Sequence, residues 1–454
     1  PALGSEILVS INQRDPSLHD LHAIDVATGA SRLVRIAPPG ASDWIVDQSG
    51  LVRLVERTAP DAGVEFVRPE PDGSWSLAMT IPPEDAITTR VLGFGPDPSA
   101  LYLSDSRKRD TAALVRLLLV TSRATSLAAH GRVDLDEVLR HPATGEVQAV
   151  AFKPDRLTWT ALETDAGRAI QADLDHLRSL HDADFTIASR TLDDQRWLIA
   201  YWDDDGPMAC YLYDRALPMK DPRRTRFLFY HRDRLAQVPL APMHAIHIRA
   251  SDGLPLTAYL TLPRGIRPPA AAAPDADASS PPESPLNLPM VLLVHGGPWA
   301  RDSWGYNPLH QLLANRGYAV LSVNFRASTG FGKAFVNAGD RQWGARIQDD
   351  LTDSVRWAID HGIADPARIA IVGGSFGGYA AQCGLAFTPD LYACGVSLVG
   401  PSDLTTLLES IPPYWAHMRS VFTRRVGDVT TPEGREFLLS RSPLTHAGQI
   451  RRPL

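Results

Sequence analysis

The chain has 454 residues, of which 44% are hydrophobic and 21% charged, and its formal net charge is −7 at pH 7. This length exceeds one ordinary hydrophobic core, so we expect two domains, and the acidic balance without a dense basic face excludes nucleic acid as a partner. No run of about 18 apolar residues occurs, so we expect no membrane-spanning helix. The three cysteines, Cys210, Cys383 and Cys394, lack metal-ligand spacing, so the sequence implies no disulfide framework, no metal and no organic cofactor.

Residues 1–240 are predicted to form an incomplete β-propeller. They show no long amphipathic helix but many short β-type runs, punctuated by turn signals such as Pro71-Asp72-Gly73. These runs cover residues 7–11, 21–25, 51–55, 64–68, 91–94, 101–104, 113–120 and 197–202. A recurrence of strand and turn every roughly forty residues is typical of propeller blades and predicts about five or six of them; a pair of β-sandwiches is the structural alternative.

The second predicted domain covers residues 241–454 and opens with a hairpin. Strands at 244–249 and 256–260 flank a turn that contains Asp252-Gly253. His244 and His247 lie on opposite faces of the first strand, so we interpret them as solvent-facing or packing residues rather than a ligand pair. Residues 268–288 are rich in Pro, Ala and Ser, which predicts a disordered surface loop inserted within this domain.

After this loop, strands and helices alternate regularly. The predicted strands cover 291–294, 319–323, 368–372 and 395–399, and the predicted helices lie around 309–313 and 349–359. Gly317 closes the first helix, and Asp349 and Asp350 stand in the first turn of the second, where the helix dipole favours negative charge. Strands that alternate with helices predict a doubly wound, mostly parallel sheet.

The sequence Gly373-Gly374-Ser375-Phe376-Gly377 fits the G-x-S-x-G pattern of a nucleophile elbow. In such an elbow a strand turns sharply into a helix and lifts the serine hydroxyl above the sheet. Glycines two residues before and after the serine are required, because side chains there would collide with neighbouring elements. We therefore predict that Ser375 is the catalytic nucleophile.

A serine nucleophile also needs donors for the oxyanion that forms when it attacks a carbonyl. His295-Gly296-Gly297-Pro298 follows a predicted strand, as the HGG-type oxyanion motif of α/β hydrolases does. We predict that the backbone N–H groups of Gly297 and Phe376 form the oxyanion hole. The two motifs predict an α/β-hydrolase domain, so with the strand recurrence of residues 1–240 the predicted fold is a β-propeller followed by an α/β-hydrolase domain.

The chain resembles the prolyl oligopeptidase family of serine peptidases, particularly its acylaminoacyl-peptidase-like branch. The resemblance is carried by 295–299, by 324–332, by Gln342-Trp343-Gly344, by the elbow and by Ser442-Pro443-Leu444, which together cover the second domain almost end to end. It implies an N-terminal propeller that limits substrates to short peptides. Phe331 and Phe376 stand where many members of this family carry tyrosine, which removes a hydroxyl but leaves the backbone donors intact.

The remaining triad members are missing from the expected positions, since an α/β hydrolase places an acid and then a histidine after later strands. Past Ser375 the acids are Asp390, Asp403, Glu409, Asp428, Glu433 and Glu436, and the histidines are His417 and His446. Asp403 comes one strand too early, and His446 stands in a segment that looks structural in the family. We expect a fragment that lacks the triad Asp and His and the first blades, with an unpaired sheet edge, low stability and no activity of its own.

The predicted function is that of a serine peptidase that hydrolyses short peptides of the acylaminoacyl, dipeptidyl or oligopeptidase type through an acyl-enzyme on Ser375. An esterase of the same fold and a non-catalytic propeller scaffold are the alternatives. No Glu-Glu pair occurs, so the amine-binding device of related dipeptidyl peptidases is not seen. Arg326 is a candidate to meet a substrate or to form a structural salt bridge, and Trp299 and Tyr379 are interpreted as packing residues. We expect a cytoplasmic location, with a periplasmic or secreted one as the alternative, and homo-oligomer formation is left open.

Overall fold

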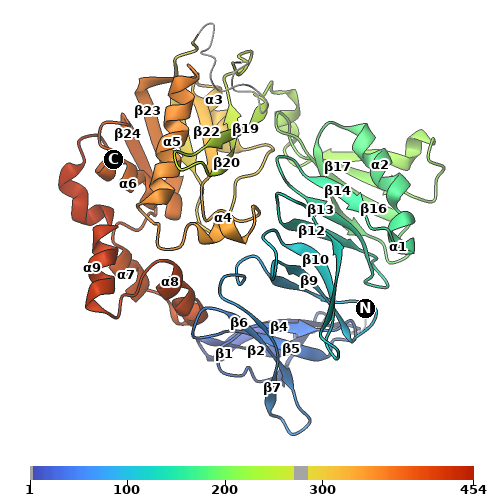
Figure 1. Cartoon of the computed structure of the whole chain (residues 1–454). Coiled ribbons are helices and arrows are strands. Elements are labelled where there is room, and N and C mark those ends of the chain that lie inside the picture. Colours follow the sequence, from blue (N-terminus) through green and yellow to red (C-terminus); the bar gives the residue numbers. More distant parts are fainter. Residues whose placement is uncertain (1–3, 270–284) are drawn as a thin grey trace.

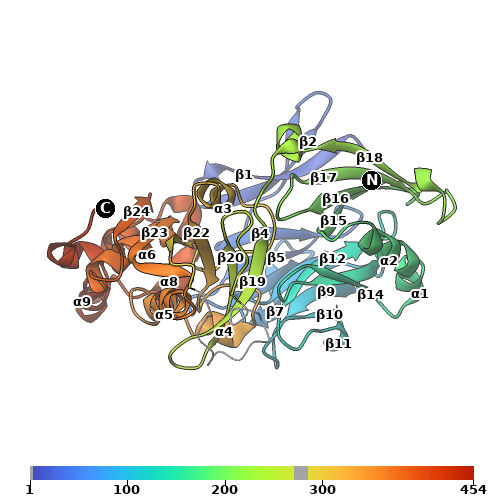
Figure 2. The same cartoon turned by 90° about the horizontal axis from the view of Figure 1, so that it is seen from above.

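The computed structural model describes residues 4–269 and 285–454. The first part of the chain forms five antiparallel sheets of three or four strands, which follow one another along an arc beside the second part (Figures 1 and 2). Most of the predicted disordered loop at 268–288 lies outside the described residues. No helix in the described ranges is long and apolar enough to cross a membrane.

The five sheets are five propeller blades, in agreement with the predicted fold class. The first contains β1 (Glu6–Asp15), β2 (Leu18–Asp25) and β3 (Ser31–Arg35), and the second β4 (Ala41–Val46), β5 (Val52–Thr58), β6 (Val64–Pro69) and β7 (Trp75–Ile81). The third contains β8 (Arg90–Phe94), β9 (Ala100–Asp105), β10 (Ala113–Leu118) and β11 (Arg123–Ala128), and the fourth β12 (Leu135–Arg140), β13 (Val147–Phe152) and β14 (Thr158–Ala161). The fifth contains β15 (Asp184–Arg190), β16 (Arg196–Trp202), β17 (Ala209–Asp214) and β18 (Thr225–Tyr230).

Two helices interrupt this β-rich half, where the sequence analysis expected only strands and turns. They are α1 (Asp165–Arg168) and α2 (Gln171–Leu180), and they lie between the fourth and fifth blades. Leu174 and Leu177 are three residues apart on α2 and are both fully buried, so they share one apolar face. With only ten residues, α2 offers too short a periodic pattern to stand out in the sequence.

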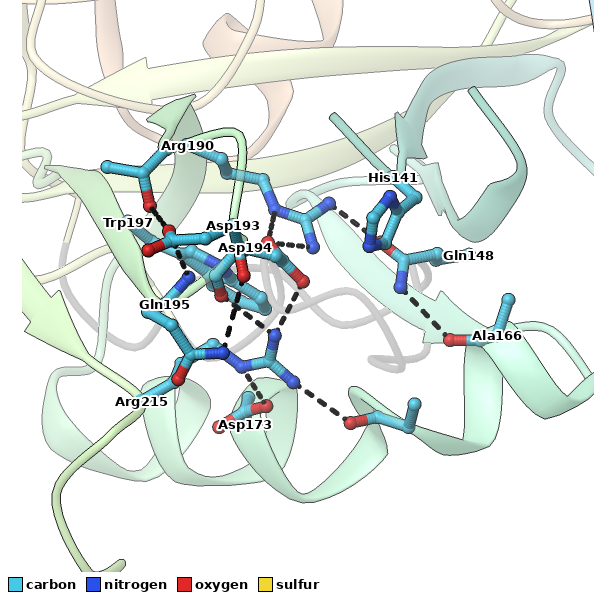
Figure 3. A network of polar contacts seen from close by, with 12 residues as sticks. His141, Gln148, Ala166, Asp173, Arg190, Asp193, Asp194, Gln195, Trp197 and Arg215 are labelled. Atoms are coloured by element: carbon cyan, nitrogen blue, oxygen red, sulfur yellow. Dashed lines mark hydrogen bonds and ion pairs between the residues drawn. The ribbon is translucent and has the colours of Figure 1, made fainter. Parts of the chain in front are cut away.

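A buried ionic network fastens α2 to the fifth blade (Figure 3). The Arg215 guanidinium donates to Asp173 of α2 through Nε (2.9 Å) and to Asp194 through Nη1 (2.5 Å). Arg190 donates to the same Asp194 through Nε (2.6 Å). The Trp197 ring lies 4.5 Å from the Arg190 guanidinium carbon and 4.9 Å from that of Arg215. Each buried charge therefore has a partner, as burial in a low-dielectric interior requires.

The second part of the chain is built around one six-stranded sheet. Its strands are β19 (Met243–Arg249), β20 (Pro255–Thr261), β21 (Leu288–Val294), β22 (Ala319–Asn324), β23 (Ala364–Gly374) and β24 (Cys394–Leu398), in the order β19-β20-β22-β21-β23-β24. The hairpin β19–β20 is antiparallel, as predicted, and β22, β21, β23 and β24 run parallel. Each of the four parallel strands includes a run that the sequence pattern marks as a strand.

Helices connect and follow these strands. They are α3 (Pro308–Ala314), α4 (Lys333–Asn337), α5 (Arg346–Asp360), α6 (Phe376–Phe387), α7 (Leu404–Glu409), α8 (Arg419–Arg425) and α9 (Pro432–Ser440). The crossover through α3 runs in one direction across the sheet, and those through α5 and α6 run in the other. Since parallel crossovers are right-handed, α3 covers one face while α5 and α6 share the other. The sheet is therefore doubly wound, as predicted.

β24 is the last strand of the sheet in the described residues, and its outer side is largely open. Val396 and Leu398 are 45% and 55% exposed, and the following Val399 is 91% exposed. The Gly395 N–H donates to the carbonyl of Pro453 (2.9 Å), so the end of the chain lies against this edge.

Candidate active site

Ser375 stands between the end of β23 and the start of α6, in the strand–turn–helix context that the sequence predicts. Its backbone angles are φ 54° and ψ −119°, which side-chain-bearing residues seldom adopt. The Ser375 N–H donates to the Leu398 carbonyl (2.9 Å), and its own carbonyl accepts from the Tyr379 N–H (3.0 Å). Contacts on both sides therefore hold the serine in a strained conformation.

The two glycines of the elbow pattern are required by close backbone approach. A Cβ atom on Gly377 would lie 2.1 Å from the Val294 carbonyl oxygen, and one on Gly373 would lie 2.4 Å from the Gly377 carbonyl carbon. Real Cβ atoms essentially never lie within 3.0 Å of such a neighbour. Both neighbours are backbone atoms, which cannot move aside as the end of a flexible side chain can. The turn can therefore bring Ser375 next to the loop that follows β21 only with glycine at both positions.

The predicted oxyanion-hole residues flank the serine. Gly297 and Phe376 line the same pocket as Ser375. A Cβ on Gly296 would lie 3.6 Å from the Ser375 Cβ, which places the loop after β21 directly against the nucleophile. Phe376 is the first residue of α6, so its N–H has no partner within the helix. The structure brings these residues together, and their use as oxyanion donors stays a prediction.

Ser375 opens onto an apolar pocket of about 740 Å³. The pocket is lined by Gly297, Trp299, Trp343, Ser375, Phe376, Val399, Gly400, Pro401, Leu407, Trp415, His417, Met418 and Phe422. Trp299, interpreted from the sequence as packing, contributes to this wall and packs on Phe422 with ring centroids 5.7 Å apart. Tyr379 is a packing residue: it is buried and its hydroxyl donates to the Arg441 carbonyl (2.8 Å).

The segment 407–422 supplies much of the pocket wall, although no motif in the sequence predicts a role for it. The sequence feature that could have indicated a pocket wall here is the aromatic pair Tyr414-Trp415, which follows two prolines. These residues lie in a short 3-10 helix (Pro413–Met418), where large aromatic side chains have little core to pack into. Trp415 is half exposed and lines the pocket. The segment is brought next to Ser375 by the tertiary fold, which local sequence patterns do not reveal.

His295, next to the oxyanion loop, is held in a structural role. Its Nδ1 lies 2.7 Å from the Gly296 carbonyl and its Nε2 lies 3.0 Å from Ser328 Oγ. The ring stacks on Phe325 with centroids 4.3 Å apart. Burial lowers the pKa of His295 to about 4, so the ring is neutral at pH 7. Its contacts position the glycine loop rather than Ser375.

The later histidines and acids are not assembled into a triad in the described residues, where the Ser375 hydroxyl makes no hydrogen bond. Asp403 caps α7, accepting from the Thr405 N–H (2.7 Å). His446 is half-buried, packs on the Phe387 ring with centroids 5.0 Å apart, and contacts the Ser440 carbonyl (3.1 Å). His417 lines the pocket from the 3-10 helix, and burial lowers the pKa of its imidazole.

Arg326 and a group of three aspartates are further candidates for binding a substrate or a metal ion. Arg326 is buried in an ion pair and does not line the pocket. Asp203, Asp204 and Asp205 form the one group in the described ranges whose ligand atoms lie close enough together to hold a metal ion. The Asp204 carboxylate already accepts from the Met243 N–H (2.6 Å), and none of the three lines the pocket of Ser375.

Comparison with known proteins extends the resemblance to both domains. The chain is 42% identical over 454 residues to dipeptidyl aminopeptidase BIII of Pseudoxanthomonas mexicana, covering 100% of this chain and 63% of that protein. It is 32% identical to dipeptidyl peptidase family member 6 of Caenorhabditis elegans, covering 100% of the chain and 62% of that protein. A puromycin-hydrolyzing peptidase of Mycobacterium tuberculosis has the same fold, with a TM-score of 0.68 at 21% identity over 99% of this chain and 68% of that one.

The chain thus spans less than two thirds of the length of the two curated relatives. The sequence model of the prolyl oligopeptidase family matches residues 304–451. This match covers three of the six strands of the sheet, β22, β23 and β24, and includes the elbow. The propeller that precedes it is shared with the solved relative. Residues 304–451 thus match the prolyl oligopeptidase family, and the chain as a whole is similar to the peptidases named above.

Proposed function

We propose that the protein containing this chain is a serine peptidase that cleaves short peptides through an acyl-enzyme on Ser375. The observation that carries this proposal is the elbow: Ser375 is held at φ 54° beside the Gly296-Gly297 loop and opens onto an apolar pocket. Strain of this kind persists only where surrounding contacts maintain it, and it gathers at functional sites.

In the proposed reaction the Ser375 oxygen forms a bond to the carbonyl carbon of the scissile peptide. The negative charge that develops on the carbonyl oxygen is met by the N–H groups of Gly297 and Phe376. The C–N bond then breaks, and the amine leaves with the proton that came from the serine hydroxyl. Water hydrolyses the resulting ester and regenerates Ser375. A base must carry the proton in both steps, and the proposal requires a histidine and a carboxylate for this task.

The pocket supports a substrate with an apolar residue on the acyl side of the scissile bond. Its walls are mainly aromatic and aliphatic, and such pockets gain affinity from the apolar area that they bury. The names of the two curated relatives favour release of dipeptides from a free N-terminus. The propeller lies beside the domain that carries Ser375 (Figure 1), and this arrangement favours short peptides over folded proteins.

Two measurements on the full-length gene product test this proposal. A fluorophosphonate probe should label Ser375, located by mass spectrometry, and should not label Ser375→Ala. Rates should then be compared on a dipeptidyl anilide, the same anilide with an acetylated N-terminus, and a p-nitrophenyl ester. Preference for the free dipeptidyl anilide supports the proposal, preference for the acetylated compound indicates an acylaminoacyl peptidase, and preference for the ester favours an esterase. Absence of labelling overturns the proposal in favour of a non-catalytic scaffold.

A further inference from the structure

Helix α8 joins the wall of the Ser375 pocket to the propeller. Phe422 lines the pocket, and Met418, which immediately precedes the helix, lines it as well. Arg425 follows Phe422 by three residues, which places the two side chains about one helical turn apart. Arg425 is only 1% exposed, which is rare for an arginine and requires several partners.

The Arg425 guanidinium has acceptors from two other parts of the fold. Its Nη1 donates to Asn337 Oδ1 (2.9 Å) at the end of α4 and to Asp340 Oδ1 (2.7 Å) just beyond it. Its Nη2 donates to the Pro83 carbonyl (2.7 Å) in the turn between β7 and β8 of the propeller. The Arg425 carbonyl accepts from the Arg341 N–H (2.6 Å), so backbone and side chain face the same contact region.

Helix α4 also contacts this propeller turn, through Lys333 and Asn337. The Lys333 ammonium donates to Asp85 Oδ1 (2.7 Å) and to the Ser106 carbonyl (3.1 Å). The Asn337 amide donates to the Glu84 carbonyl (2.9 Å). Lys333 thus binds the same turn as Arg425, and within the described residues it forms no hydrogen bond or ion pair with α8, which makes it a matched control.

We infer that Arg425 is a positioning residue that sets the pocket wall of Ser375 against the propeller. The planar guanidinium with its five N–H groups can hold three acceptors at once, which a lysine ammonium at the end of a flexible stem cannot do in the same geometry. Without Arg425, α8 loses its link to the Pro83 turn, and the wall formed by Met418 and Phe422 becomes free to shift. Ser375 and the oxyanion loop stand on β23, α6 and the segment after β21, so the chemical step keeps its geometry.

This inference rests on the proposed function for its kinetic consequence. In the full-length gene product, Arg425→Met should raise KM for a dipeptidyl anilide with leucine on the acyl side by about tenfold, while kcat changes by less than about threefold, because ground-state and transition-state binding weaken together. Arg425→Lys should fall between the wild type and Arg425→Met. Lys333→Met should leave KM within about twofold of the wild type, because it does not touch the pocket wall.

Hydrogen–deuterium exchange of the same proteins separates this inference from the proposed function, because exchange needs no substrate. Arg425→Met should speed exchange in residues 413–422, and Lys333→Met should speed it only near residues 83–85 and 333–337. Unchanged exchange in 413–422 of Arg425→Met would overturn the inference, as would an equal rise of KM in Lys333→Met. If the wild type hydrolyses nothing, the proposed function fails and the exchange comparison alone decides the role of Arg425.

Discussion

Arg326 and Asp350 form a bidentate ion pair inside the hydrolase domain. Arg326 Nε donates to Asp350 Oδ2 (2.8 Å) and Nη2 donates to Oδ1 (2.6 Å), while the Arg326 backbone N–H donates to Oδ2 (2.9 Å). Asp252 lies 2.9 Å from the same Nη2. Of the two roles that the sequence leaves open for Arg326, the structure therefore shows the salt bridge.

Replacement of Arg326 by methionine should destabilise the protein strongly. The Asp350 carboxylate is fully buried, and loss of its partner costs about 3–5 kcal/mol of unfolding free energy. Urea unfolding followed by tryptophan fluorescence measures this loss. The double variant Arg326→Met with Asp350→Leu should recover part of it, because no fully buried charge is then left unpaired and the remaining Asp252 carboxylate is 33% exposed. A double variant less stable than Arg326→Met would contradict this account.

Gly377→Ala should destabilise the hydrolase domain by about 1–3 kcal/mol, because the added methyl group overlaps the Val294 carbonyl and forces the elbow apart. Thermal unfolding of the variant measures the loss. Gly131→Ala is the control, since a Cβ there meets nothing within 4 Å. Equal unfolding temperatures for the two variants would show that the close approach at Gly377 is not rigid.

Ser375→Gly should raise the free energy of unfolding by about 1 kcal/mol while abolishing labelling by a fluorophosphonate. Glycine adopts φ 54° without the steric cost that a side-chain-bearing residue pays. Ser375→Ala lacks the hydroxyl and should also lose labelling. It keeps the Cβ, so it should gain no stability. Chemical denaturation of the three proteins makes the comparison, and a stability of Ser375→Gly at or below that of the wild type would argue against strain at the elbow.

Stability should fall as the solution becomes acidic because of His310. Burial lowers the pKa of this imidazole to about 3, and its nitrogens lie 3.0 Å from Thr261 Oγ1 and 2.8 Å from Ser322 Oγ. In the unfolded chain a histidine takes up its proton near pH 6.5, so between about pH 6.5 and pH 3 the unfolded state binds the additional proton. The free energy of unfolding should therefore be full above about pH 6.5 and decrease below it by up to about 1.4 kcal/mol per pH unit.

Urea midpoints at several pH values between 5 and 8 test this dependence. His310→Gln should flatten the decrease below pH 6.5, although the buried His295 still contributes to it. The exposed His231→Gln is the control and should leave the slope unchanged. A slope equal to that of the wild type in His310→Gln would show that His310 does not control the acid sensitivity.

The elbow could be predicted from the sequence because its constraints are local. The positions of Gly373, Ser375 and Gly377 follow from the sharpness of one turn, and the flanking runs show whether a strand precedes it and a helix follows. The strand pattern of the propeller likewise repeats over short distances, although α2 was missed because its apolar face is only about three turns long.

Tertiary structure alone decided which distant side chains meet. The partners of Arg326 lie 24 and 74 residues away, and Arg425 reaches the Pro83 carbonyl across 342 residues. Much of the pocket wall comes from the segment 407–422, which carries no recognised motif. Such contacts depend on how the sheet and blades stack, and many sequences with the same local patterns would pair these charges differently. By itself, the sequence determined the fold class and the place of the candidate nucleophile, because turn sterics and strand or helix periodicity act between near neighbours. The packing of whole elements determined the pocket around Ser375 and its link to the propeller, because burial and ion pairing act between residues brought together only by the fold.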